Sequence, residues 1–180
     1  MEANKVQELH EHAEHAREHK GLLPVSLSMA VIAVLAALVT MMGHRSHTEE
    51  VLLQGEITDQ WGYYQAKNTQ SALAEQALDL LALSSAPAET KQKVGEKYQK
   101  KVEKYAEKMK DLEAEGHRLE AERNLTQRRA VFLDIAESLL EAALVVVSIT
   151  LLTSRRSYWY VGLAVAVAGT AVTVVGVLLK

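Results

Sequence analysis

Two long runs without a charged side chain constrain this chain more than any other feature of its sequence. They extend over Leu22–Met42 and Tyr158–Leu179 and contain 21 and 22 residues. At a rise of about 1.5 Å per residue in an α-helix, either run can cross the roughly 30 Å hydrocarbon core of a bilayer. We therefore expect transmembrane helices at 22–43 and 158–180, with Pro24 in the first turn of the former.

A third apolar stretch, residues 130–153, has the length of a span but contains the carboxylates Asp134, Glu137 and Glu141. Only the tight loop 154–157 separates it from the last run, so the last span must start at the surface that this helix has reached. We therefore predict three spans, and the fold class is an all-α integral membrane protein. A charge at the bilayer centre costs about 2.5 to 3.5 kcal/mol, which makes an intramembrane acid a functional candidate.

The three carboxylates share one helix face, because their offsets are three and four residues. Asp134 and Glu137 can pair with the histidines and arginines that flank the spans, as ordinary interfacial pairs. Glu141 lies about two turns deeper than Asp134. Equal steps along the two antiparallel spans predict hydroxyl partners for Glu141 on the last span. The expected intramembrane polar set, with Glu141 opposite Thr170 and Ser138 opposite Thr173, is Asp134, Glu137, Ser138, Glu141, Thr170 and Thr173.

The loop before the last span carries basic and aromatic side chains that are typical of a membrane-water interface. These residues are Arg155, Arg156, Tyr158, Trp159 and Tyr160. Arginines in so short a loop favour the cytoplasmic side, which places the N-terminus in the cytoplasm, whereas Arg45, Arg128 and Arg129 around the middle section oppose this orientation. We expect a multi-pass membrane protein.

Residues 1–21 are rich in Glu and His and predict an amphipathic helix on the membrane surface. A cleaved signal peptide is the alternative, but the acidic flank and the long apolar run disfavour it. His12, His15 and His19 share a helix face that could bind a metal. We nevertheless predict a chain with no metal and no cofactor, since no further ligands accompany them.

Residues 44–129 contain 15 acidic and 14 basic side chains and one proline, Pro87. This composition predicts two long helices with a turn near 84–90, which form an antiparallel hairpin stalk between the first and second spans. Apolar residues at alternating spacings of four and three define a heptad seam on each helix. The register places Trp61 near Leu112 and Gly116, and Asn68 near Tyr105. The predicted packing residues are Ile57, Trp61, Tyr64 and Asn68 on the first helix, and Tyr98, Val102, Tyr105, Met109, Leu112 and Gly116 on the second.

Composition also excludes several function classes. The chain has no Cys, 23 acidic and 20 basic side chains, and no phosphate-binding loop or nucleophile motif. Eight Lys between 91 and 110 could indicate a polyanion partner, but interleaved Glu favour a solvated helix face. We therefore predict no enzyme activity and no nucleic-acid partner.

The segment Asp59–Lys67 reads D-Q-W-G-Y-Y-Q-A-K. It resembles the signature of a bacterial membrane-protein family known as domain of unknown function 4337. In that family a Glu/His-rich start, a span, this segment, a charged helical region and two closing spans follow in the same order. The resemblance covers nearly the whole chain, with Gly62 in place of an expected Ala. It implies a multi-pass protein of the bacterial inner (cytoplasmic) membrane and no established activity.

Two functions remain open on the sequence. The first is a non-enzymatic membrane scaffold that associates through stalk and spans with copies of itself or with other membrane-protein subunits. The second is an ion-conducting or proton-coupled subunit that uses Glu141, Thr170 and Thr173. One span, a helical excursion and two further spans resemble the layout of bacterial proton-motor stator subunits, an architectural analogy.

Overall fold

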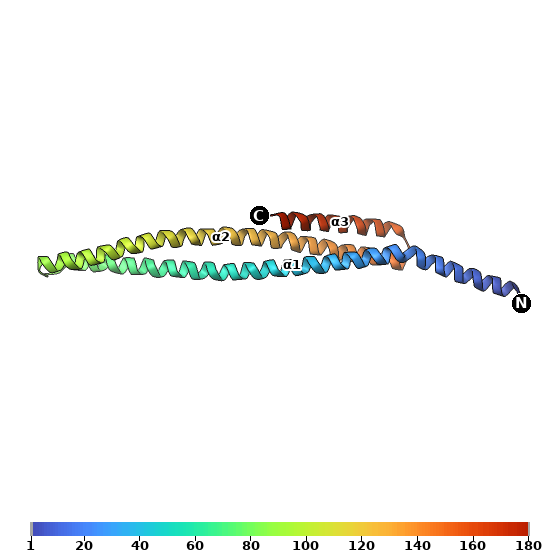
Figure 1. Ribbon diagram of the computed structural model, residues 1–180, viewed down its shortest axis with the longest axis horizontal. Helices are drawn as coiled ribbons and strands as arrows, with labels where there is room; N and C mark the ends of the chain where they lie inside the picture. Colours follow the sequence, from blue (N-terminus) through green and yellow to red (C-terminus); the bar gives the residue numbers. More distant parts are fainter. Residues whose placement is uncertain (1, 180) are drawn as a thin grey trace. The chain divides into compact units, whose positions relative to one another are not determined.

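The computed structural model of the chain describes the backbone of residues 2–179 and the side chains of residues 22–179 (Figure 1). The described residues are all-helical, with α1 at Glu2–Leu83, α2 at Ala88–Thr153 and α3 at Arg156–Leu178. The chain divides into two compact units. We call them the three-helix unit, Met1–His47 with Gln127–Lys180, and the hairpin unit, Thr48–Thr126. Both α1 and α2 contribute residues to both units.

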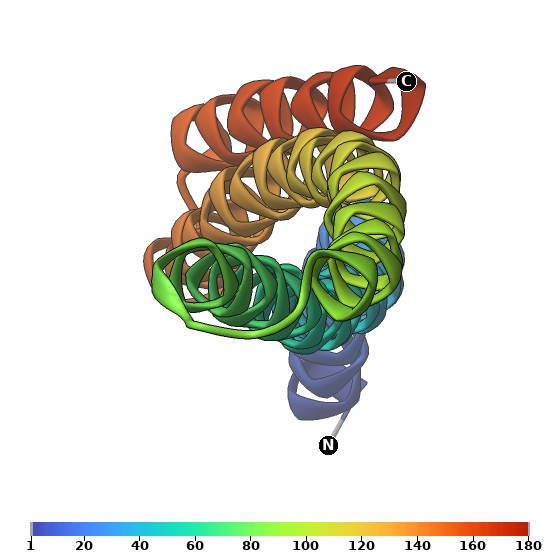
Figure 2. The same cartoon turned by 90° about the vertical axis from the view of Figure 1, so that its left-hand side faces the viewer.

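The hairpin turn is shorter than the 84–90 stretch that the sequence predicts. Figure 2 shows the short connection that joins the ends of α1 and α2. The last turn of α1 closes with the Ser84 amide 3.3 Å from the Leu81 carbonyl oxygen. Pro87 precedes α2, and its carbonyl accepts the Lys91 amide at 3.0 Å. Proline suits this position because an amide at a helix start has no partner inside the helix.

The second connection consists of Ser154 and Arg155, so the predicted loop 154–157 was too long. Ser154 has φ 54°, in the left-handed region that commonly ends helices. Its amide donates to the Thr150 carbonyl at 2.8 Å, which completes the last turn of α2. Arg156 is already helical and belongs to α3.

The first apolar run is not at the start of a helix. Helix α1 already starts at Glu2, and Pro24 lies inside this helix. The expectation that Pro24 occupies a first helical turn was therefore wrong. The side chains of residues 1–21, including the N-terminal histidines, lie outside the described residues. The amphipathic character of this segment and the solvent-facing histidines therefore stay predictions.

In the three-helix unit, α2 packs against both α1 and α3 (Figure 1). Its residues Leu133, Ala136, Leu140, Ala143 and Val147 are fully buried. Complete burial on a single helix requires neighbours on two sides, because one neighbour covers only part of a helix surface. The α1 side of this core consists of Val25, Ile32, Ala36 and Val39.

A row of glycines lets α3 lie very close to α2. Gly162, Gly169 and Gly176 are spaced by seven residues and all are buried. A methyl group on Gly169 would come 3.1 Å from Leu140 Cγ and 3.2 Å from the Ala136 carbonyl oxygen. Small residues with this effect are typical of helix contacts in membranes. The sequence interpretation missed this row, although its seven-residue spacing is visible in the chain.

In the hairpin unit, Leu53, Ile57 and Leu119 form a small buried cluster on which Trp61 packs. Of the other predicted seam residues, Gly116 is buried and Asn68 is exposed. The rest are half-buried, namely Tyr64, Tyr98, Val102, Tyr105, Met109 and Leu112. Two helices alone give each side chain a neighbour on one side only. Trp61, Tyr64, Met109 and Leu112 are therefore each half-buried in the hairpin.

Candidate functional site

Trp61, at the centre of the signature segment, packs against α2 of the hairpin. The ring lies over Gly116, where a methyl group would come 3.2 Å from Cε2 and Cζ2 of the indole. This contact lies where the heptad register places it. The indole Nε1 donates to Glu120 Oε1 at 3.0 Å. Tyr64 and His117 meet the indole edge to face, each with ring centroids 5.5 Å apart. Trp61 is therefore held on several sides.

Two further side chains of the signature segment also reach across the hairpin. Gln60 Nε2 donates to the Leu112 carbonyl at 3.0 Å. Lys67 Nζ lies 5.7 Å from the centroid of the Tyr105 ring and 5.0 Å from that of Tyr63, within cation-π range. The side chains of this segment that face α2 thus bind the second helix of the hairpin.

The predicted place of Asn68 opposite Tyr105 was wrong. Asn68 is exposed, and the half-buried Lys67 lies over the Tyr105 ring instead. The contact row of α1 therefore advances by three residues after Tyr64, to Lys67, and not by four. It then continues through Ser71 and Ala74, both buried.

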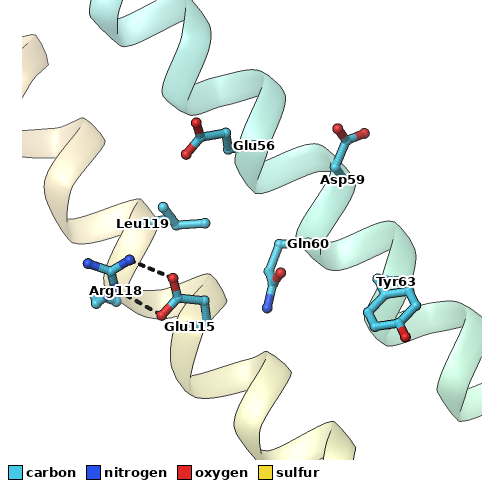
Figure 3. A pocket seen from close by; sticks show the side chains of 7 residues that line it. All are labelled: Glu56, Asp59, Gln60, Tyr63, Glu115, Arg118 and Leu119. Atoms are coloured by element: carbon cyan, nitrogen blue, oxygen red, sulfur yellow. Dashed lines mark hydrogen bonds and ion pairs between the residues drawn. The ribbon is translucent and has the colours of Figure 1, made fainter.

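Residues of the same segment, together with Glu56 one turn earlier, line an open groove of the hairpin (Figure 3). Its lining residues are Glu56, Asp59, Gln60 and Tyr63 from α1 and Glu115, Arg118 and Leu119 from α2. The one cation in this lining is committed to Glu115, because Arg118 Nε donates to Glu115 Oε2 at 2.9 Å and its Nη2 to Oε1. The groove therefore presents acidic and aromatic side chains.

Two carboxyls of the hairpin have lowered pKa values. The hydrogen bond from Arg118 lowers the pKa of Glu115 below its ordinary value of 4.5. The hydrogen bonds from His117 and then from Trp61 lower the pKa of Glu120 in the same direction. Both groups are therefore charged near neutral pH, and their hydrogen bonds depend on that charge.

In the three-helix unit, two of the predicted intramembrane carboxylates contact α1. Asp134 Oδ1 lies 3.1 Å from His47 Nε2, an ion pair when the imidazole is protonated. The Thr40 hydroxyl lies 2.7 Å from Glu137 Oε1 and 3.0 Å from the Ala36 carbonyl oxygen. The sequence interpretation missed Thr40.

The predicted pairing of Glu141 with Thr170 was wrong. Glu141 is exposed on α2, and among the described residues it has no hydrogen-bond or ion-pair partner. Thr170 Oγ1 donates to the Ala166 carbonyl of its own helix at 2.8 Å. The glycines of α3 occupy the contact with α2, so Leu140 meets Gly169 and the neighbouring Glu141 faces away.

The pairing of Ser138 with Thr173 was wrong for the same reason. Thr173 Oγ1 donates to the Gly169 carbonyl at 3.0 Å, and Ser138 Oγ donates to the Asp134 carbonyl at 2.9 Å. Each hydroxyl therefore bonds to its own helix. The hydrogen-bonding groups of α2 and α3 do not meet at these positions.

The residues predicted for the membrane interface divide into two groups. Arg155, Arg156, Tyr158 and Tyr160 are exposed. Trp159 is half-buried, and its Nε1 donates to Ser28 Oγ of α1 at 2.9 Å. Trp159 therefore also connects α3 to α1.

Within residues 22–179, no three His, Asp or Glu side chains gather in a way that could hold a metal ion. In the same part of the chain, α1, α2 and α3 are each long and apolar enough to cross a membrane. The large apolar side chains exposed on the three-helix unit include Leu27, Val34, Leu38, Val167 and Val174.

The described residues define an all-helical protein in which two long helices pack together and a third, shorter helix packs against the second. The chain belongs to the family described as Domain of unknown function (DUF4337), whose model matches residues 22–179. The resemblance carried by Asp59–Lys67 is thus confirmed. No curated protein and no solved structure matches the chain.

Proposed function

We propose that this protein is a non-enzymatic, membrane-anchored assembly subunit that associates with copies of itself through its hairpin and its spans. Insertion of three spans is supported by the apolar side chains that the three-helix unit exposes on α1 and α3. In water such a surface would promote association, whereas lipid tails cover it without loss. The exposed Arg155 and Arg156, at the connection and at the start of α3, favour a cytoplasmic N-terminus.

The observation that carries the assembly role is a row of exposed leucines on the hairpin. Leu73, Leu80 and Leu83 are 59%, 69% and 85% exposed. Their spacing of seven and three residues places them on one stripe of α1, separate from the stripe that contacts α2. An apolar stripe in heptad spacing is the contact surface that a further helix requires, and the same row on another copy supplies one.

The size of the purified protein tests this function. We expect light scattering of the detergent-solubilised full chain to give a mass of at least two copies. Leu73→Glu combined with Leu80→Glu should shift the population toward smaller species, because opposed like charges repel at such a contact. Asn68→Glu is the control, since Asn68 is also exposed on α1 but does not share the spacing of the leucine row. A chain that is monomeric at all concentrations would exclude the assembly role.

Membrane insertion is tested separately. We expect the full chain to stay in the membrane fraction after alkaline washing, which removes proteins bound only at the surface. A reporter fused after Leu179 and a second inserted at Ser85 should report opposite or equal sides according to the number of spans between them. In the three-span arrangement two spans, those of α2 and α3, lie between these two sites, so both reporters should be on the same side of the membrane. Release of the chain by the alkaline wash would refute the anchor.

One observation favours the second function, an ion-conducting or proton-coupled subunit. Glu141 is an acidic side chain exposed on the apolar part of α2, without a partner among the described residues. Thr170 and Thr173 do not join it, so the case rests on Glu141 alone. A proton flux across vesicles that contain the wild-type chain, and that is lost with Glu141→Gln while assembly persists, would establish this function in place of the first.

A further inference from the structure

We infer that the face of α2 around Glu141 is the site at which two copies of this chain pack span against span, with Glu141 bonded across the contact. This inference rests on the proposed function. The face consists of Ser138, Glu141, Val145 and Leu152, all exposed. Their spacings of three, four and seven residues form one heptad stripe, separate from the buried residues that contact α1 and α3.

The depth of Glu141 makes an uncovered carboxyl unfavourable there. Leu140, its neighbour, lies against Gly169 of α3. Gly169 is at the middle of the uncharged run 158–179, so Glu141 lies near the centre of the bilayer when α3 spans it. Lipid tails offer no hydrogen-bond partner, and ionisable side chains at that depth face a protein partner or a water-filled cavity.

A second copy supplies the missing partner at the same depth. In a parallel two-fold pair, each residue of the stripe meets the same residue of the other copy or its neighbour. Glu141, as a neutral carboxylic acid, then donates to the carboxyl of the second Glu141 or to the hydroxyl of Ser138. Ser138 Oγ uses its hydrogen on the Asp134 carbonyl and keeps its lone pairs free to accept. Val145 and Leu152 pack around this polar contact, as their exposed apolar side chains allow.

Disulfide cross-linking tests the contact directly, because the chain contains no natural Cys. The full chain is reconstituted in phosphatidylcholine vesicles at low density and oxidised. We expect rapid dimer formation from Ser138→Cys and Val145→Cys. The matched controls are Val34→Cys on α1 and Val167→Cys on α3, both exposed within the apolar runs, and these should form dimers slowly. Control positions that cross-link as fast as Val145→Cys would overturn the inference.

The role of the carboxyl is tested in the Val145→Cys chain. Glu141→Leu should weaken association about tenfold, which corresponds to about 1.4 kcal/mol, the strength of an interhelical hydrogen bond. Glu141→Gln should retain association, because its amide donates and accepts. An unchanged cross-linking rate with Glu141→Leu would refute the role of Glu141. An oligomeric chain that fails these tests refutes this contact alone, whereas a chain that is monomeric by light scattering refutes the proposed function as well.

Discussion

Gly116 of α2 lies directly under the indole of Trp61, and a methyl group on this glycine would come 3.2 Å from two of the ring carbons. The ring cannot move away freely, because its Nε1 is bonded to Glu120. Gly62, one residue after Trp61, instead has no atom within 4 Å of such a methyl group. The two glycines therefore form a matched pair for measuring how tightly the hairpin packs.

The first prediction concerns these glycines. Gly62→Ala should stabilise the protein by up to about 1 kcal/mol, the difference in helix propensity. Gly116→Ala should gain less, since the indole must shift, and Gly116→Leu should destabilise by about 1 to 3 kcal/mol through overpacking. Thermal unfolding in detergent, followed by circular dichroism, measures these changes. Equal gains from both alanine variants would show that the indole does not rest on Gly116.

The second prediction concerns the contact of α3 with α2. Gly169→Leu should destabilise the three-helix unit by about 1 to 3 kcal/mol or more, because Leu140 and the Ala136 carbonyl occupy the space. Ala168→Leu, on the exposed side of the same helix turn, is the control and should have little effect. The readout is the fluorescence of Trp159, in a chain where Trp61 is replaced by Phe. If Gly169→Leu left the unfolding midpoint unchanged, α3 would not pack against α2 through its glycines.

The third prediction concerns the hydrogen bond between Thr40 and Glu137. Thr40→Val keeps the shape of the side chain but leaves the partly buried carboxyl without this partner, at a cost of about 1 to 3 kcal/mol. Thr170→Val removes a hydroxyl that bonds only to its own helix, and should cost much less. Unfolding midpoints of the two variants in the same detergent give the comparison. Equal losses would indicate that Glu137 does not depend on Thr40.

The fourth prediction concerns Thr150, which is 1% exposed and whose hydroxyl has no hydrogen-bond partner within the described part of the chain. A buried hydroxyl without a partner is unfavourable, and valine fills almost the same volume. Thr150→Val should therefore raise the unfolding temperature. A lower unfolding temperature would reveal a partner for this hydroxyl, such as a buried water molecule.

The fifth prediction concerns the stability of the hairpin at acidic pH. The pKa values of Glu115 and Glu120 are lower in the folded hairpin than their ordinary value of 4.5. Their stabilising contribution is therefore fully present above about pH 4.5, and it is lost as the pH falls through the lowered values. Glu115→Gln with Glu120→Gln should flatten this acid-side decline in unfolding midpoint. Glu113→Gln, on the same helix, is the control, and an unflattened decline in the double variant would contradict the prediction.

The sequence by itself determined the features that depend on local periodicity. Uncharged runs of more than 20 residues required long helices, the Ser-rich stretch before Pro87 required a break, and spacings of four and three required a seam. The register followed from counting residues outward from the turn. It placed Trp61 beside Gly116 because a two-helix hairpin with a short turn has few other registers available.

Only the tertiary structure decided which of two neighbouring stripes faces the partner. Lys67 and Asn68 are both one turn beyond Tyr64, and the ring of Tyr105 on the other helix favours the lysine. Likewise, hydroxyls on α3 looked like partners for Glu141, but a helix approaches most closely on its smallest side chains. The glycines of α3 therefore form the contact with α2, and Glu141 lies on a different, exposed face of α2. Which face of a helix makes the contact depends on close packing between the helices, and the periodicity of a single helix does not reveal this packing.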